Sequence, residues 1–162
     1  MSIKKITITD VAQQAGVSVT TVSLVLSGKG RISPTTVEKV NQAIEQLGYV
    51  RNRQAATLRG GESGVIGLIL RDICEPFYAE MTAGLSEALE AHDKLLFLTQ
   101  SGRDGQGLQR AFDALLAQGV DGIVLAGGIR AAAGLKEKAA EQGVPLVCVA
   151  RSSGLDGVDV VR

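Results

Sequence analysis

Basic side chains are concentrated at the start of this 162-residue chain. Residues 1–60 carry eight Lys or Arg and three Asp or Glu, a net charge of +5, and the remaining residues carry nine basic and fourteen acidic side chains, a net charge of −5. A basic segment is suited to binding the phosphates of a polyanion. The distribution favours a nucleic-acid-binding module joined to a domain of another kind, although a chance imbalance would give the same figures.

Candidate catalytic and metal-binding side chains are few and scattered. Cys74, Cys148 and His92 have no spacing typical of a zinc site or a disulfide framework. His92 has no evident partner that would orient it toward a nucleophilic thiol. A GxGxxG motif after the first expected strand and a GxxxxGK[ST] motif are both absent. We therefore expect no enzyme activity, no metal and no cofactor.

The apolar runs have the length of strands rather than of membrane helices. The strongest covers residues 65–70, and the N-terminal segment has no apolar stretch of signal-peptide length. We expect a cytoplasmic protein that does not insert into a membrane.

Capping residues predict two short helices near the N-terminus. Thr9 is a candidate N-cap of a first helix over residues 9–15, which ends at Gly16. Ser18 then caps a second helix that runs to about Leu26. Two helices joined at such a tight corner are typical of a helix-turn-helix, whose second helix can enter the major groove of DNA.

A third helix is expected from Ser33, its N-cap, and Pro34, its first residue, to Gly48, where it ends. Its apolar residues recur at helical spacing and would complete a three-helix core. Any small helical bundle would show these caps, so the pattern predicts an all-α head without fixing its function.

After a glycine-rich break at residues 60–64, strands and helices alternate. Apolar runs predict strands over residues 65–70, 95–99, 123–126 and 146–149. Helical stretches separate them near residues 78–91, 106–118 and 134–142. This alternation predicts successive βαβ units and a parallel sheet, with a further strand beginning at the end of the sequence.

A resemblance to the lactose/galactose repressor family (LacI/GalR) runs from Thr7 to Arg59. It is carried by the motifs DVAxxAGVSxxTVS and NRxAxxL. The resemblance implies a helix-turn-helix domain over residues 1–50, a hinge helix and linker over 51–61, and a periplasmic-binding-protein-like effector and dimerisation domain from residue 62. Because family members are considerably longer, we expect 62–162 to be only the N-terminal part of that sensor domain.

By this resemblance, the second helix would read base edges through Val19, Thr20 and Leu24. The lactose repressor has an arginine at the position of Leu24, and a leucine cannot donate hydrogen bonds to guanine. We therefore expect a different operator, unless Leu24 is a core residue. Six residues would contact the DNA backbone and fix the register of binding: Thr9, Ser18, Thr21, Ser23, Arg31 and Arg51. Each basic one could also be a solvated surface charge.

The resemblance assigns the minor groove to the hinge helix, through Asn52, Arg53, Ala55, Ala56 and Leu58. Leu58 would wedge between base pairs, and the alanines would let the hinge helices of a homodimer approach each other. This helix has fewer than three turns and is expected to order only on DNA, the alternative being a plain flexible linker.

Loops at the carboxyl ends of parallel strands bind ligands in open α/β sheets. Asp72, Phe77, Tyr78 and Arg151 are therefore candidate effector contacts. The resemblance supports the Phe77–Tyr78 pair and implies a small-molecule effector, expected to be a sugar or sugar phosphate. Phe77 could instead be a core residue. Ala150 stands where many relatives have an aspartate, so their ligands do not transfer directly.

The sequence thus predicts a bacterial transcriptional regulator, expected to act as a repressor. It would bind a palindromic operator in double-stranded DNA as a homodimer. Two alternatives remain: a ligand-binding module whose head does not bind DNA, and an inert truncated product that pairs with a full-length relative.

Overall fold

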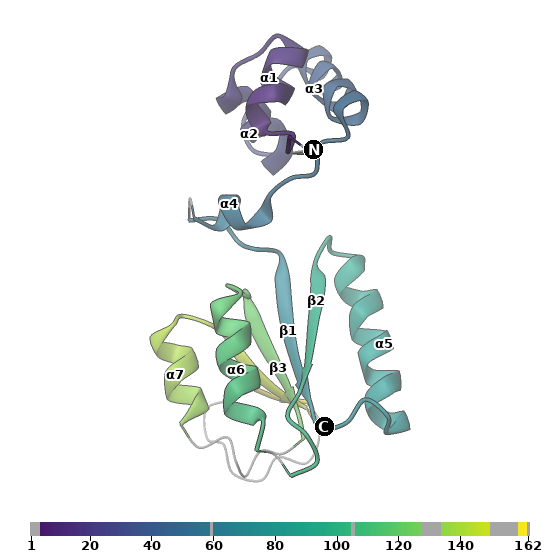
Figure 1. Ribbon diagram of the computed structural model, residues 1–162, viewed down its shortest axis with the longest axis vertical. Helices are drawn as coiled ribbons and strands as arrows, with labels where there is room; N and C mark the ends of the chain where they lie inside the picture. The colour runs from purple at the N-terminus through teal and green to yellow at the C-terminus, as the bar shows by residue number, and fades with distance from the viewer. Residues whose placement is uncertain (1–3, 59, 105, 128–133, 150–158, 162) are drawn as a thin grey trace. The chain divides into compact units, whose positions relative to one another are not determined.

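The computed structural model describes residues 4–58, 60–104, 106–127, 134–149 and 159–161, and Figure 1 labels its elements. The chain forms two compact units, Met1–Asn52 and Arg53–Arg162, called here the head and the body. The head is helical, and the body is built on a parallel sheet.

The described part of the head consists of three helices: α1 (Ile8–Ala15), α2 (Val19–Ser27) and α3 (Pro34–Leu47). Val11, Val22 and Val40, one from each helix, are fully buried in a shared core. Gly16 ends α1 at φ 68°, a left-handed conformation that costs glycine little. Because only three residues separate α1 from α2, the predicted helix-turn-helix corner is confirmed.

The predicted N-caps are correct for α2 and α3 but wrong for α1. Ser18 and Ser33 each accept a hydrogen bond from the backbone N–H three residues later. In α1 the cap is Thr7 rather than Thr9: Thr7 Oγ1 accepts from Asp10 N, and the Asp10 carboxylate accepts from Thr7 N at 2.8 Å. The hydrogen bonds that the Asp10 carboxylate accepts from the backbone N–H and the hydroxyl of Thr7 lower the pKa of Asp10. The reciprocal box needs an acceptor three residues after the cap, and an alanine stands there after Thr9.

The described part of the body contains five parallel strands in the order β2-β1-β3-β4-β5. They are β1 (Val65–Leu70), β2 (Leu95–Gln100), β3 (Gly122–Ala126), β4 (Leu146–Val149) and β5 (Asp159–Val161). The four predicted strands are confirmed to within one residue, and β5 is the expected further strand. The interior strand β1 has five of its six residues buried, as a parallel strand covered on both faces requires.

Helices cover both faces of this sheet (Figure 1). The body begins with α4 (Arg53–Thr57) and continues with α5 (Pro76–Glu90), α6 (Leu108–Ala117) and α7 (Leu135–Glu141). Phe112 of α6 and Ile69 of β1 belong to one core, whereas Leu68 of β1 packs with Tyr78 of α5 in the other. Successive strand residues point to opposite faces, so β1 supplies both cores.

Strand β2 forms one edge of the sheet and exposes apolar side chains. Leu95 is 51% exposed, and Phe97 and Leu98 are each 40% exposed. The outer side of β2 has no neighbour among the described strands. An apolar edge of this kind is suited to pairing with another chain.

We predict that Thr7→Ala lowers the free energy of unfolding of the head by about 1 kcal/mol, because it removes the capping box. Thr9→Ala is the matched control: Thr9 is exposed in the first turn, and alanine is the better helix former, so the change should be neutral or slightly stabilising. Hydrogen exchange of the α1 amides in the full chain measures both. Faster exchange in Thr9→Ala but not in Thr7→Ala would contradict this assignment.

Candidate nucleic-acid interface and ligand pocket

The first turn of α2 presents the residues expected to read bases. Val19, 36% exposed, and Thr20 lie side by side at the start of the helix, and both are accessible. Ser18 Oγ accepts from Thr21 N at 3.1 Å and lies 2.9 Å from Thr21 Oγ1, which fixes this turn. The N-terminus of a helix also carries a partial positive charge that attracts phosphate. The turn therefore combines two exposed side chains with an anion-attracting backbone.

Leu24 lies one turn farther along α2 and is half-buried. A Cβ atom placed on Gly30 would lie 3.4 Å from Leu24 Cδ2, so Leu24 contacts the loop that leads to α3. It is not part of the cluster around Val11 and Val22. Leu24 thus lies at the margin of the surface, where its exposed part can make only apolar contacts.

The remaining head residues expected at the DNA backbone differ in their surroundings. Thr9 and Arg31 are exposed, and Ser23 is half-buried. Arg51 Nη1 donates to the carbonyl of Leu26 at 3.0 Å and thereby holds the segment after α3 against the end of α2. The capping pattern gave no sign of this last contact, because 25 residues separate its partners.

The hinge segment contains one short helix, α4, of five residues. Asn52, just before it, and Ala55, within it, are exposed. Ala56 also lies in α4, but its side chain is outside the described part. Leu58 follows the helix and is 89% exposed, so it contributes little to the stability of the fold. The hinge thus contains a helix, as predicted, and the large apolar side chain of Leu58, just beyond that helix, is exposed to solvent.

Two interactions anchor this segment to the body. Arg53 donates to the backbone carbonyl of Asp93 at 3.3 Å and to its carboxylate at 3.4 Å. Farther along, Asp121 accepts hydrogen bonds from the backbone N–H of Ser63 at 2.7 Å and of Gly64 at 2.8 Å. The expected minor-groove residue Arg53 thus has a protein partner in this structure. The partners lie 40 or more residues apart, so sequence spacing could not identify them.

The expected effector residues of the body do not share one environment. Asp72 follows β1, and its carboxylate accepts from Cys74 N at 3.0 Å and from Arg103 Nε at 2.7 Å. The bonds from Cys74 and Arg103 lower the pKa of Asp72, and the same ion pair raises the pKa of Arg103. Arg151 lies outside the described residues. Asp72 is therefore ionised and already neutralised by Arg103.

Phe77 and Tyr78 begin α5 but point to different surroundings. Phe77 is 54% exposed, so it is not a core residue, whereas Tyr78 is 9% exposed and packs in the core with Leu68. Their rings meet edge to face, with centroids 5.3 Å apart. Gly127, after β3, allows the hydroxyl of Tyr78 to approach, because any Cβ there would collide with Oη. Tyr78 thus packs at the ends of β1 and β3.

A cavity of about 470 Å³ lies at the carboxyl ends of β1 and β2. It is lined by residues 71–72, 100–104, 107 and 110, so it includes Asp72 but neither Phe77 nor Tyr78. None of its three arginines, Arg71, Arg103 and Arg110, was expected from the sequence. Arg71 and Arg103 lie one and three residues after β1 and β2, so the rule that selected Asp72 could have found them.

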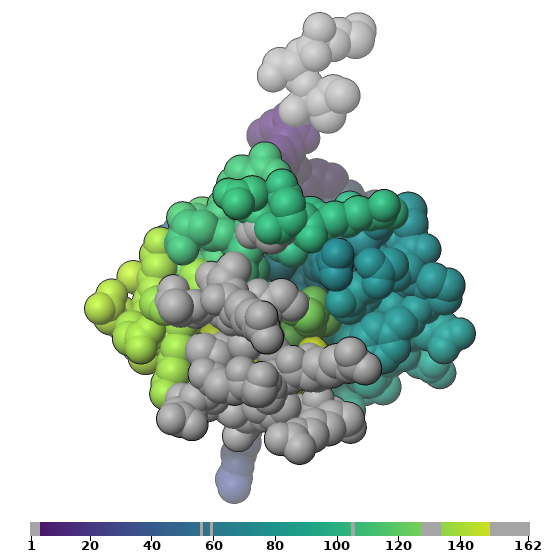
Figure 2. Space-filling view, turned by 90° about the horizontal axis from the view of Figure 1, so that it is seen from below, coloured from purple at the N-terminus to yellow at the C-terminus, as the bar shows by residue number. Residues whose placement is uncertain are grey.

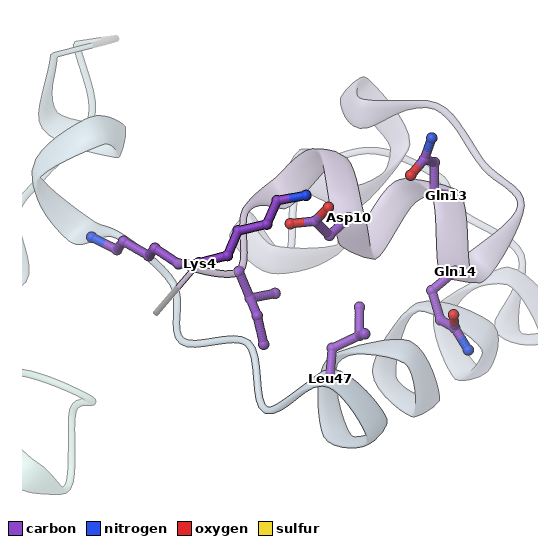
Figure 3. Close-up of a pocket in the computed structure, with 7 residues that line it drawn as sticks. Lys4, Asp10, Gln13, Gln14 and Leu47 are labelled. Atoms are coloured by element: carbon purple, nitrogen blue, oxygen red, sulfur yellow. The ribbon is translucent and has the colours of Figure 1, made fainter. Parts of the chain in front are cut away.

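A second cavity, in the head, is shown in Figure 3. It is lined by residues 4–6, by α1 and by Leu47 of α3. Lys4 and Asp10 lie on one side of it and Gln14 and Leu47 on the other (Figure 3). None of the expected base-contacting residues lines this cavity.

Three further observations concern metal binding, thiol reactivity and membrane insertion. The described part of the chain holds no group of three His, Cys, Asp or Glu side chains that could bind a metal ion. Cys148 is buried, and this burial raises the pKa of its thiol, which disfavours the reactive thiolate. None of the described helices is long and apolar enough to cross a membrane.

Two family models match the chain. Residues 7–52 match bacterial regulatory proteins of the lacI family, and residues 63–162 match the periplasmic binding proteins and sugar binding domain of the LacI family. The lac repressor dimer bound to operator and the anti-inducer ONPF has a similar structure, with a TM-score of 0.75 and 30% identity over 90% of this chain and 44% of that one.

Individual relatives agree with the family models. The maltose regulon regulatory protein MalI of Escherichia coli K12 is 61% identical over 98% of this chain and 46% of its own length. MalI of Vibrio furnissii is 56% identical over 76% of this chain and 90% of its own length. The chain thus spans about half the length of the Escherichia coli relative. With its helix-turn-helix head and parallel-sheet body each matched, this chain belongs to the LacI family of bacterial regulatory proteins.

Proposed function

We propose that this chain is a sequence-specific DNA-binding transcriptional regulator that represses by binding a palindromic operator as a homodimer. The observation that carries the proposal is the exposed first turn of α2, held within a helix-turn-helix head that carries six basic and three acidic side chains, a net charge of +3. The relatives are regulatory proteins by name, and a role in transcription places the protein in the cytoplasm and requires no catalysis.

In this proposal Val19 and Thr20 contact base edges, and Leu24 makes apolar contact with a neighbouring base, for example with a thymine methyl group. Because Leu24 is half-buried against Gly30, only its exposed atoms would contact the base. A leucine in this position selects against sites that need a guanine-reading donor. The operator should therefore differ from that of the lactose repressor.

Contacts to the DNA backbone orient the head. We assign them to Thr9, Ser18, Thr21, Ser23, Arg31 and Arg51. The bond from Arg51 to the carbonyl of Leu26 uses one of the donors of the guanidinium, which leaves others for a phosphate. These contacts carry little sequence information and make binding dependent on salt.

The hinge, residues 51–61, binds the minor groove in this proposal. Leu58 is the wedge, because it is 89% exposed and its insertion between base pairs would bury apolar surface. Asn52, Ala55 and Ala56 lie where, in this proposal, the hinge helices approach the minor groove and each other. Arg53 can leave Asp93 at little cost, because the carboxylate side of that ion pair is 97% exposed.

Dimerisation is assigned to residues 62–162 of the body, through the apolar edge at β2. Burial of the exposed side chains of Leu95, Phe97 and Leu98 against a second copy would remove apolar surface from water and so stabilise the dimer. The body also senses a small-molecule effector of the sugar class, with Asp72, Phe77, Tyr78 and Arg151 as candidate contacts. The sugar binding domain named in the family model supports this assignment.

Substitutions at Leu58 and Thr20 should separate affinity from sequence preference. Leu58→Ala should weaken binding to every operator roughly tenfold or more, because the wedge acts at any site of the right shape. Thr20→Ala should instead change the ranking of operators, by about 1–3 kcal/mol at the base pair it contacts. Selection from a randomised duplex library, followed by titration of the selected sites, measures both. An equal loss at every site for both variants would contradict this division.

Adding a negative charge at the β2 edge should weaken dimerisation. We expect Leu95→Asp and Phe97→Asp each to raise the dimer dissociation constant about tenfold or more, because an interface cannot bury an unpaired carboxylate cheaply. Ala140→Asp, at an exposed site on α7, is the matched control. Sedimentation equilibrium measures the dissociation constants, and circular dichroism verifies folding. A folded Phe97→Asp variant that dimerises like the control would exclude β2 from the interface.

A further inference from the structure

The cavity at the carboxyl ends of β1 and β2 differs in charge from the rest of the body. Residues beyond 60 carry a net charge of −5, yet the cavity is lined by three arginines and two aspartates. Figure 2 views the molecule toward the ends of the strands, where the loop after β2 and the start of α6, in green, border this face. A local excess of positive charge on an acidic domain requires a physical explanation.

Only one of the three arginines is neutralised within the described residues. Arg103 pairs with Asp72, whose side chain is only 14% exposed. The other aspartate, Asp104, accepts from the backbone N–H of Gln106 at 3.1 Å. Arg71 and Arg110 are both exposed, and neither makes an ion pair or a hydrogen bond with another described residue. Among the described residues, two guanidinium groups at this cavity are thus left without a protein partner.

The backbone adds to this positive potential. Helix α6 has ten residues, its N-cap is Gly107, and no side chain accepts a hydrogen bond from its first turn. Gly107 and Arg110, on either side of the start of that turn, both line the cavity. The first N–H groups of a helix and its dipole favour an anion, and two arginines offer forked donors that match phosphate oxygens.

We propose that this cavity binds the phosphate group of the effector, with Arg71 and Arg110 as its principal ligands, so that the ligand class is a phosphorylated rather than a neutral sugar. This inference rests on the effector-sensing function proposed above. The Asp72–Arg103 pair positions the loop after β2 and holds Arg103 away from the phosphate. A phosphate monoester carries close to two negative charges at neutral pH, which two arginines can balance.

Isothermal titration calorimetry tests the proposal. Glucose 6-phosphate, glucose or inorganic phosphate is titrated into the full chain, without DNA, in chloride buffer at physiological ionic strength. We expect glucose 6-phosphate to bind and glucose to show no binding at the same concentration. Arg71→Gln and Arg110→Gln should each raise the dissociation constant for glucose 6-phosphate about tenfold. Lys39→Gln, which removes one exposed positive charge from α3 of the head, should leave it unchanged.

Binding of inorganic phosphate alone would support the anion site and identify free phosphate as its source. Equal binding of glucose and glucose 6-phosphate, or binding that both glutamine variants retain, would overturn the proposal. Operator binding, measured on the same preparations, is independent of these outcomes. A chain that binds operator but not phosphate would contradict this inference alone, and a chain that binds phosphate but no operator would contradict the proposed DNA-binding function instead.

Discussion

The recognition surface depends on the burial of three valines where the helices of the head meet. Helices of eight and nine residues are too short to persist alone in water, so α1 and α2 are held by this shared core. Because Val22 faces inward, Thr20, two positions earlier and about 200° around the helix, faces solvent. Val19 lies in the first turn of α2 at the margin of the packed face, where it is 36% exposed. The same packing that stabilises α2 therefore determines which of its side chains can reach DNA.

In the body, too, the packing of the core determines where functional side chains can lie. Its interior strand β1 supplies side chains to two cores, and both depend on helices that cross from one strand to the next. Parallel strands place all their carboxyl ends on one side, which brings Asp72 and Arg103 together although 31 residues separate them. Tyr78 packs at the ends of β1 and β3, whereas the cavity lies at the ends of β1 and β2.

Local patterns predicted the elements well, because caps and apolar spacing act within a few residues. Ser18, Ser33 and the strand bounds follow from such patterns, and Thr9 was wrong because the reciprocal bond with Asp10 favours Thr7. Contacts between distant residues, such as Arg53 with Asp93 and Arg51 with Leu26, depend on tertiary folding and could not be predicted. The expected DNA contacts came from family resemblance and remain predictions, although their exposed positions are compatible with that role.

The central claim is that the head reads a specific sequence as part of a dimer. The most direct measurement is to mix the full chain with sheared DNA of its source genome at moderate salt, and to recover and sequence the retained fragments. We predict enrichment of a short palindrome, because a two-fold dimer presents two copies of α2 to two half-sites. Uniform retention of all fragments, or retention of none, would contradict the claim.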